Sequence, residues 1–214
     1  MEKMPYQDAI AHPSPAQVTS AFDWHFGLPT IRHQKVTLRE VCEDDAAALM
    51  AMLTSEEVAE FISPLPRTVE GFKSFISEVH EERLAGQSFC FGIVPDGYED
   101  AMGLFQVRQL EPGFVSAEWG FALGSPFWGS GVFQEGARAI IDFTFGVVGV
   151  HRLEARSIAS NVRGNGALRK MGAMQEGILR RAFQRNGRYF DQVLWSILKE
   201  DWHQDKAVWG PKLH

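Results

Sequence analysis

The sequence predicts one α+β domain whose core is a mixed, mostly antiparallel sheet. Three observations support this class. Two helical segments precede three consecutive strand-like segments, a glycine-rich turn then opens a long helix, and a last pair of strands is joined by Asn186-Gly187, a strong hairpin signal. The consecutive strands are expected to form a meander, and the helix after them to return the chain as one crossover. The 214 residues, 45% of them hydrophobic, suffice for one substantial core.

The N-terminal part is expected to run from an irregular segment into a strand and two helices. Residues 1–33 form the predicted leader or arm, because they hold four prolines and little periodicity. Within them the apolar side chains at 22–28 alternate, as in a short strand or an arm packed on the body. Residues 36–40 have strand composition, and three acidic residues then open a helix that ends near Leu53. Residues 68–84 keep the apolar spacing of a second helix.

The remaining elements follow from apolar composition, helical spacing and turn residues. The further predicted strands are β-rich and bounded by glycine, proline or asparagine, and they lie at 88–94, 101–110, 114–123, 153–158, 175–184 and 190–198. The further predicted helices lie at 132–148 and 163–171. Residues 203–214 are expected to be a C-terminal tail.

Composition argues against several classes of protein. No stretch approaches the roughly 18 consecutive apolar residues of a membrane helix, and the start lacks the apolar core of a secretory signal, so we expect a soluble, cytoplasmic protein without a membrane partner. The net charge of −6 argues against nucleic acid as the main partner. The histidines lack HxxxH or HExxH spacing and Cys42 and Cys90 lie outside any CxxC, so we expect no metal.

Charge is distributed unevenly along the chain. Residues 1–150 carry 9 lysines and arginines against 21 acidic residues, a net −12, whereas residues 151–188 carry 9 against 2, a net +7. Two interpretations of the basic segment stay open: a solvated face or pairing with the acidic part, and a site for a phosphorylated ligand.

A glycine-rich turn precedes the helix that begins near Gly131. Gly129 and Gly131 flank a single serine, so the backbone can approach a ligand, and the first free amides of the helix favour phosphate. A plain tight turn is the alternative. There is no GxxxxGK[ST] for a nucleotide triphosphatase, and the third glycine of a Rossmann fingerprint would fall at Gln134, so both of these phosphate loops are excluded.

The order of segments around this turn resembles the GNAT superfamily of N-acetyltransferases, in its ribosomal-protein N-terminal acetyltransferase branch. The resembling segments are Ala117-Glu118-Trp119-Gly120-Phe121, Phe127-Trp128-Gly129-Ser130-Gly131, Gln134-Glu135-Gly136-Ala137-Arg138, His151-Arg152-Leu153-Glu154-Ala155, Asn161-Val162-Arg163-Gly164, and the stretches 167–173, 176–180 and 187–198. The resemblance runs from about Val36 to Trp202, and it marks residues 34–202 as the domain.

The resemblance implies a GNAT-like sheet of about seven strands, splayed into a cleft between strands four and five and flanked by about four helices. It implies transfer of an acetyl group from acetyl-CoA to a primary amine, on a protein N-terminus or a small molecule, by direct attack in a ternary complex. The coenzyme-binding residues that it implies are Phe121 and Leu123 for the pantetheine arm, Trp128 for the cleft wall, Gly129, Ser130, Gly131 and Val132 for the pyrophosphate, Asn161, and Arg169 or Lys170 for the phosphates.

Glu118 is the implied catalytic residue, drawing the amine proton through water; an ordinary strand carboxylate paired with a basic neighbour is the alternative. Two positions depart from the family pattern: Pro126 opens the pyrophosphate loop, and Gly164 stands where relatives have the serine proposed as general acid. Ser160, Tyr189 or water stay open as replacements. These departures favour a second hypothesis, a coenzyme-binding sensor without turnover. The loop at 61–67 is expected to choose the acceptor, and the leader is left open as a lid or as an arm of a homodimer.

Overall fold

A computed structural model describes residues 22–62 and 64–202, in which one eight-stranded sheet has the order β1-β2-β3-β4-β5-β6-β8-β7. The predicted tail at 203–214 and most of the predicted leader lie outside the described residues. The strands are β1 (Ile31–Arg32), β2 (Val36–Glu40), β3 (Ser88–Pro95), β4 (Gly103–Gln109), β5 (Ser116–Leu123), β6 (Arg152–Ile158), β7 (Met174–Arg185) and β8 (Arg188–Leu198). The α-helices are α1 (Ala46–Leu53), α2 (Glu56–Ala59), α3 (Val69–Leu84), α4 (Val132–Phe143) and α5 (Val162–Lys170).

The sheet has the mixed topology that the sequence predicts. Strands β1 to β5 pair antiparallel in chain order, β6 then pairs parallel with β5, and β8 lies between β6 and β7 and pairs antiparallel with both. The predicted crossover from β5 to β6 runs through α4, and the predicted hairpin joins β7 to β8. Asn186 (φ 47°) and Gly187 (φ 72°) both adopt left-handed backbone at its turn, which is why the Asn-Gly step suits this position.

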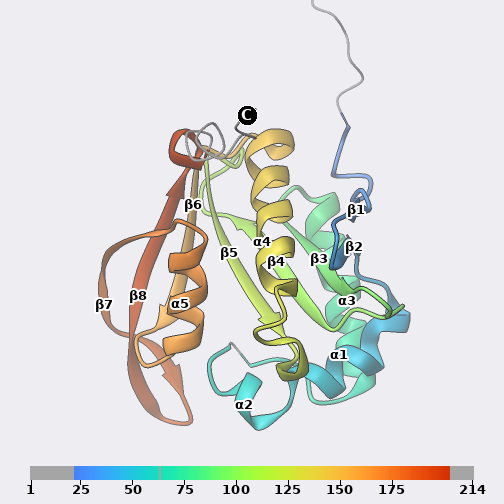
Figure 1. Cartoon of the computed structure of the whole chain (residues 1–214), viewed down its shortest axis with the longest axis horizontal. Coiled ribbons are helices and arrows are strands. Elements are labelled where there is room, and N and C mark those ends of the chain that lie inside the picture. The colour runs from blue at the N-terminus through green and yellow to red at the C-terminus, as the bar shows by residue number, and fades with distance from the viewer. Residues whose placement is uncertain (1–21, 63, 203–214) are drawn as a thin grey trace, which may run out of the picture.

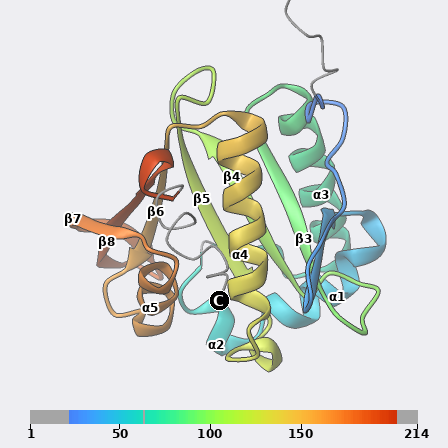
Figure 2. The same cartoon turned by 45° about the horizontal axis from the view of Figure 1, so that its top comes forward.

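Helices cover both faces of the sheet. One core lies between α4 and strands β2 to β6, and its largest members include Phe91, Phe105 and Ile140. The other core packs α1 and α3 on the opposite face, around Leu49, Phe72 and Ile76. Figure 1 accordingly shows α4 in front of the strands and α3 behind them. In Figure 2, α5 and the β7–β8 hairpin lie on one side of α4, with α1 and α3 on the other.

Three local differences from the predicted elements have simple physical reasons. The two-residue strand β1, within the segment expected to be irregular, and the four-residue helix α2 are both too short to show a periodic pattern. The helix predicted to reach residue 148 ends at Phe143 and continues as one π-helical turn over Thr144–Val148, where the Thr144 hydroxyl donates to the carbonyl of Ile140 at 2.7 Å.

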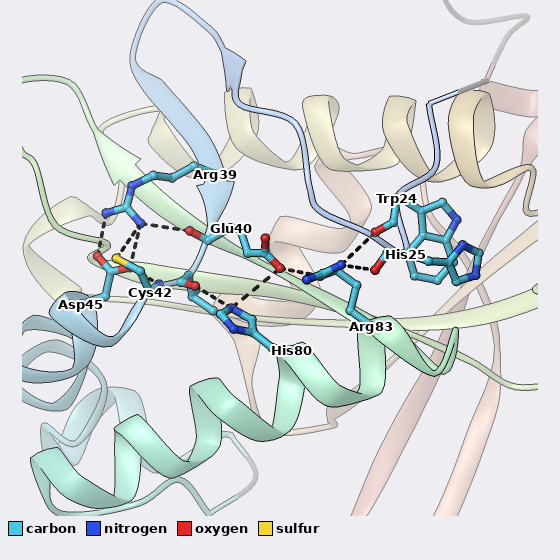
Figure 3. A network of polar contacts seen from close by, with 9 residues as sticks. Trp24, His25, Arg39, Glu40, Cys42, Asp45, His80 and Arg83 are labelled. Atoms are coloured by element: carbon cyan, nitrogen blue, oxygen red, sulfur yellow. Dashed lines mark hydrogen bonds and ion pairs between the residues drawn. The ribbon is translucent and has the colours of Figure 1, made fainter. Parts of the chain in front are cut away.

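The segment before β1 packs on the body as an arm. Trp24 is 6% exposed and contacts Phe89 and Phe114, whereas Phe26 is 80% exposed. The buried guanidinium of Arg83 on α3 donates to the backbone carbonyls of Trp24 and His25 and to the carboxylate of Glu40 (Figure 3). Of the two interpretations of the alternating residues 22–28, the structure therefore shows the packed arm, anchored by one arginine.

Acid stability depends in part on a pair between β6 and β7. Arg152 donates two hydrogen bonds to Glu176, and Ser196 donates a third, which together lower the pKa of Glu176 to about 2. A carboxyl with a lowered folded pKa stabilises the fold above its unfolded pKa of about 4.5 and loses this contribution as the pH falls towards about 2. We expect Glu176→Gln to be less stable than the parent at pH 7 by at most about 1 kcal/mol, because solvent screens this exposed pair.

The same reasoning predicts that the difference in stability between Glu176→Gln and the parent disappears as the pH falls towards about 2. Urea denaturation of both proteins between pH 7 and pH 2 measures it. A stability difference that persists unchanged to the lowest pH would contradict the role of the Arg152–Glu176 pair, since the glutamine cannot titrate.

Candidate active site

The cleft begins where β5 and β6 separate. The two strands are paired only at Ser116, Ala117 and Glu118, opposite residues 152–154, although β5 continues to Leu123 and β6 to Ile158. The splay predicted between the fourth and fifth strands of the family is confirmed here as β5 and β6, because the short β1 adds one to the count. Beyond Glu118, the backbone groups of β5 on the side away from β4 therefore face an opening and not a neighbouring strand.

The larger pocket, about 940 Å³, lies at the open end of this splay. Its walls come from β5, the turn before α4, the start of α5 and the region of α2. Of the predicted coenzyme residues, those that line it are Phe121, Leu123, Trp128, Gly129, Ser130, Gly131, Asn161 and Lys170. The structure does not bring Val132 or Arg169 into this pocket: Val132 is 5% exposed and packs in the core, and the guanidinium of Arg169 lies over the ring of Trp195, 5.6 Å from the centroid.

The turn at residues 129–131 has the geometry of an anion cradle. Gly129 (φ 75°) and Gly131 (φ 93°) are left-handed, which turns the backbone sharply at the start of α4. Among the described residues, no acceptor is paired with the backbone N–H of either glycine. The amide of Val132 instead donates to the hydroxyl of Ser130 at 3.3 Å, and this hydroxyl donates to the carbonyl of Phe127 at 2.7 Å. The glycine amides are thus the free donors of the turn.

One cation contacts the turn, and two more line the same pocket. Lys35, between β1 and β2, donates from Nζ to the carbonyl of Ser130 at 2.9 Å, so that its charge lies beside Gly131. The guanidinium of Arg163 lies 3.5 Å from the ring centroid of Trp128, and Lys170 lines the same pocket from the end of α5. Lys35 was not predicted, since it is 95 residues from its partner in the chain, and Arg163 was predicted only as part of the basic segment.

Trp128 and Asn161 are held in place by local hydrogen bonds. Trp128 donates from Nε1 to the carbonyl of Leu123 at 2.8 Å, which sets the ring against the end of β5. The side chain of Asn161 accepts from the backbone N–H of Gly164 at 2.8 Å and so caps α5. Both side chains therefore shape the pocket wall whatever further contacts they make.

A second pocket, about 460 Å³, lies on the other side of the splay and contains Glu118. The carboxylate is 14% exposed; its Oε2 accepts from Arg108 Nη2 at 2.5 Å and Nε at 3.1 Å, and its Oε1 lies 3.8 Å from Arg156 Nε. Glu118 is therefore both a pocket residue and an ion-paired strand carboxylate. Tyr189, one of the groups considered as a proton donor, is exposed and lines neither of these pockets.

The two pockets adjoin, and we call the region lined by their shared residues the passage. Six residues line both of them: Phe61, Ile62, Phe121, Ala122, Asn161 and Gly164. Arg185 on the β7–β8 hairpin donates to the carbonyls of Ala59 and Ile62 and so fixes the loop that carries the first two. The glycine turn and Glu118 therefore lie in adjoining pockets.

No cluster of three or more histidine, cysteine, aspartate or glutamate side chains that could hold a metal occurs within residues 22–62 and 64–202. None of the helices in that part of the chain is long and apolar enough to cross a membrane. What the cleft offers is free backbone amides and cations at one end and a carboxylate at the other.

Comparison with known families decides what kind of protein has this cleft. Residues 35–174 match the model of the acetyltransferase (GNAT) domain. The chain belongs to the GNAT family. This match confirms the resemblance inferred from the sequence. It also confirms the predicted class of enzyme, an acetyl-CoA-dependent acyltransferase.

Relatives of this GNAT protein agree in sequence and in fold. The "Uncharacterized N-acetyltransferase p20" of Bacillus licheniformis is 26% identical over 176 residues, which cover 82% of this chain and 99% of that protein. The ribosomal-protein-S5-alanine acetyltransferase of Vibrio fischeri superposes with a TM-score of 0.73 at 22% identity, over 82% and 99% of the two chains. Mycobacterium smegmatis RimJ, solved in complex with CoA-disulfide, superposes with a TM-score of 0.71 at 24% identity, over 81% and 88%.

Proposed function

We propose that the chain transfers an acetyl group from acetyl-CoA to the primary amine of a second substrate, by direct attack while both substrates are bound. The observation that carries this proposal is the passage between two pockets, with an anion cradle at one end and Glu118 at the other. An amine can react directly with a thioester, so a covalent enzyme nucleophile is not required.

The pyrophosphate of acetyl-CoA fits the glycine turn. Free amides of Gly129 and Gly131 and the positive end of the α4 dipole would hold it, and Lys35, Arg163 and Lys170 supply compensating charge. The pantetheine arm would run along the unpaired edge of β5 at Phe121 and Leu123. The departure at Pro126 leaves these groups intact, because the cradle is made of backbone amides after it.

Glu118 is proposed to receive the proton of the attacking amine. An alkyl amine with a pKa of about 10.4 is mostly protonated at neutral pH, so the reaction needs a proton acceptor near the amine. Glu118 already accepts hydrogen bonds from Arg108, and an intervening water could carry the proton to its remaining lone pairs. Arg108 and Arg156 would hold the carboxylate in a fixed position at the head of the cleft.

The acceptor is proposed to be a protein N-terminus or a small amine. Acetyltransferases named for ribosomal proteins are among the similar structures, which supports a protein N-terminus. Leu65, Phe75 and Phe183 line the second pocket beside Glu118, so the amine would be presented by an apolar group or a short, unfolded chain end. Gly164 favours the second candidate, a coenzyme sensor without turnover, since it removes a hydroxyl from the wall of the passage.

Calorimetric titration with acetyl-CoA, followed by assays of CoA release with peptides and small amines, tests both candidates. We expect acetyl-CoA to bind with an affinity that weakens as salt is raised, because charges hold the phosphates. Acetylation of a peptide N-terminus or an amine supports the enzyme. Binding without transfer to any acceptor would support the sensor, and absence of binding would overturn both.

Glu118→Gln tests the proton acceptor. We expect kcat to fall by at least about tenfold and its pH dependence to shift upward, because without the carboxylate the amine must lose its proton to solvent. The affinity for acetyl-CoA is expected to stay close to that of the parent, since Glu118 lines only the second pocket.

Glu154→Gln is the matched control for this experiment. Glu154 is the register partner of Glu118 on β6, pairs with Arg152 and lines neither pocket. Its kinetics are expected to match the parent. A Glu118→Gln protein with weaker acetyl-CoA binding and an unaltered pH profile would argue against a base role.

A further inference from the structure

Two buried polar side chains in the second pocket have no hydrogen-bond partner. They are Trp119, 2% exposed, whose Nε1 is unpaired, and Ser157, 8% exposed, whose hydroxyl is unpaired. An unpaired buried donor costs about 1 to 3 kcal/mol, so such a group needs an explanation within the function or the fold. Trp119 also packs among Phe105 and Phe121 as a core ring, whereas Ser157 has little apolar surface to bury.

The hydroxyl of Ser157 lies beside Gly164. A Cβ built on Gly164 would lie 3.1 Å from Ser157 Oγ and 2.5 Å from Asn161 Nδ2. Ser157 lines the second pocket, and Gly164 beside it lines both pockets, as Asn161 does. The glycine leaves room there, since any larger residue at 164 would crowd Asn161. One rotation about the Cα–Cβ bond of a serine redirects its hydroxyl among three staggered positions.

The passage is also where bond exchange must occur. The proposed function places the coenzyme phosphates at Gly131 and the amine near Glu118, so the thioester has to lie between them. An amine that arrives as the ammonium ion releases two protons: one goes to solvent and leaves the neutral amine, and the other goes through water to Glu118 as the nitrogen forms its bond to the acetyl carbon. The carbon–sulfur bond breaks with both electrons on sulfur. Sulfur therefore gains negative charge beside the residues shared by the two pockets.

We propose that Ser157 donates a hydrogen bond from Oγ to the sulfur of the coenzyme and stabilises it as the departing thiolate. The proton stays on the serine oxygen, and the thiolate takes its own proton from solvent after release. A free cysteine thiol has a pKa of about 8.5, and a charge-assisted hydrogen bond to the sulfur favours the thiolate and lowers the pKa of such a thiol. The hydroxyl that contacts sulfur would therefore come from Ser157 on β6, because Gly164 on α5 has no side chain to provide one.

The test measures binding of CoA and of desulfo-CoA, which lacks the thiol, from pH 6 to pH 10, and so needs no acceptor. In the parent protein, the affinity for CoA relative to desulfo-CoA should rise with pH as the bound thiol ionises. In Ser157→Ala this rise should be about tenfold smaller, equivalent to a shift of about one unit in the pKa of the bound thiol, while the affinity for desulfo-CoA stays unchanged.

Ser55→Ala is the control, because Ser55 also carries a buried hydroxyl without a partner but lines neither pocket. It should bind both ligands as the parent does. Equal pH profiles for the parent and Ser157→Ala would overturn the proposal. A parent protein whose affinity for CoA relative to desulfo-CoA does not change with pH would also overturn it, and this result depends on no variant. The inference rests on the proposed function, whose own failure is distinguishable: without a coenzyme site neither ligand would bind, and without transfer the acceptor assays would release no CoA.

Discussion

Replacing Gly131 by glutamate is expected to weaken acetyl-CoA binding by at least about 100-fold, which corresponds to about 2.7 kcal/mol. The residue has φ 93°, a left-handed conformation that costs a side-chain-bearing residue about 1 to 2 kcal/mol. Its new Cβ would lie 3.0 Å from Lys35 Nζ, so the carboxylate would take up this cation and occupy the anion cradle. Calorimetric titration with acetyl-CoA measures the loss.

Gly113→Glu separates the two contributions to this effect. Gly113 has φ 84°, lies in the turn between β4 and β5 and lines neither pocket, so the same substitution brings the same backbone strain without a charge in the cradle. We expect a comparable fall in melting temperature with acetyl-CoA affinity unchanged. Undiminished binding by Gly131→Glu would mean that the turn does not hold the phosphates.

Replacing Asp45 by alanine is expected to destabilise the fold by about 3 to 5 kcal/mol and to lower the melting temperature by roughly 10 °C. Asp45 is fully buried at the start of α1, where it accepts two hydrogen bonds from Arg39 (Figure 3). It also accepts one each from the backbone N–H groups of Cys42 and Ala101. Burial opposes its ionisation, but these four donors outweigh burial and lower its pKa. Alanine would remove the only carboxylate among the described residues that the Arg39 guanidinium contacts, leaving it the carbonyls of Glu40 and Glu99, and would leave two amides without their acceptor.

Asp44→Ala is the matched control, since Asp44 is the exposed neighbour in the same acidic turn. Its effect on stability should stay within about 0.5 kcal/mol. Chemical denaturation of both variants measures the difference. Equal stabilities would show that the acidic turn acts through its general charge and not through the buried contacts of Asp45.

Helices and strands were predictable where their patterns are local and long. The apolar spacing of α3, the alternation around β3 to β5 and the Asn186-Gly187 turn each act within a few residues of chain, and each predicted element is found within a few residues of its place. Elements of two to four residues, β1 and α2, escaped prediction because their stability comes from pairing and packing with distant segments.

The candidate site was predictable in its backbone part and less so in its side chains. Gly129 and Gly131 predict a turn next to the start of a helix, and in the structure both glycines line the pocket with free backbone amides. Lys35 and Ser157 could not be predicted, because nothing in their own surroundings in the sequence points to the cleft. Arg169 and Lys170 are adjacent in the chain, yet only Lys170 lines the pocket.

By itself the sequence determined the fold class, the order of elements, the glycine turn before α4 and membership of an acetyltransferase family, because each depends on residues close together in the chain or on their order. Only the tertiary structure decided that β5 and β6 part after Glu118, that Arg108 and Arg156 hold this carboxylate, and that an unpaired hydroxyl lies beside Gly164. These features arise where strands and helices from distant parts of the chain meet, and the distances between their atoms are set by packing.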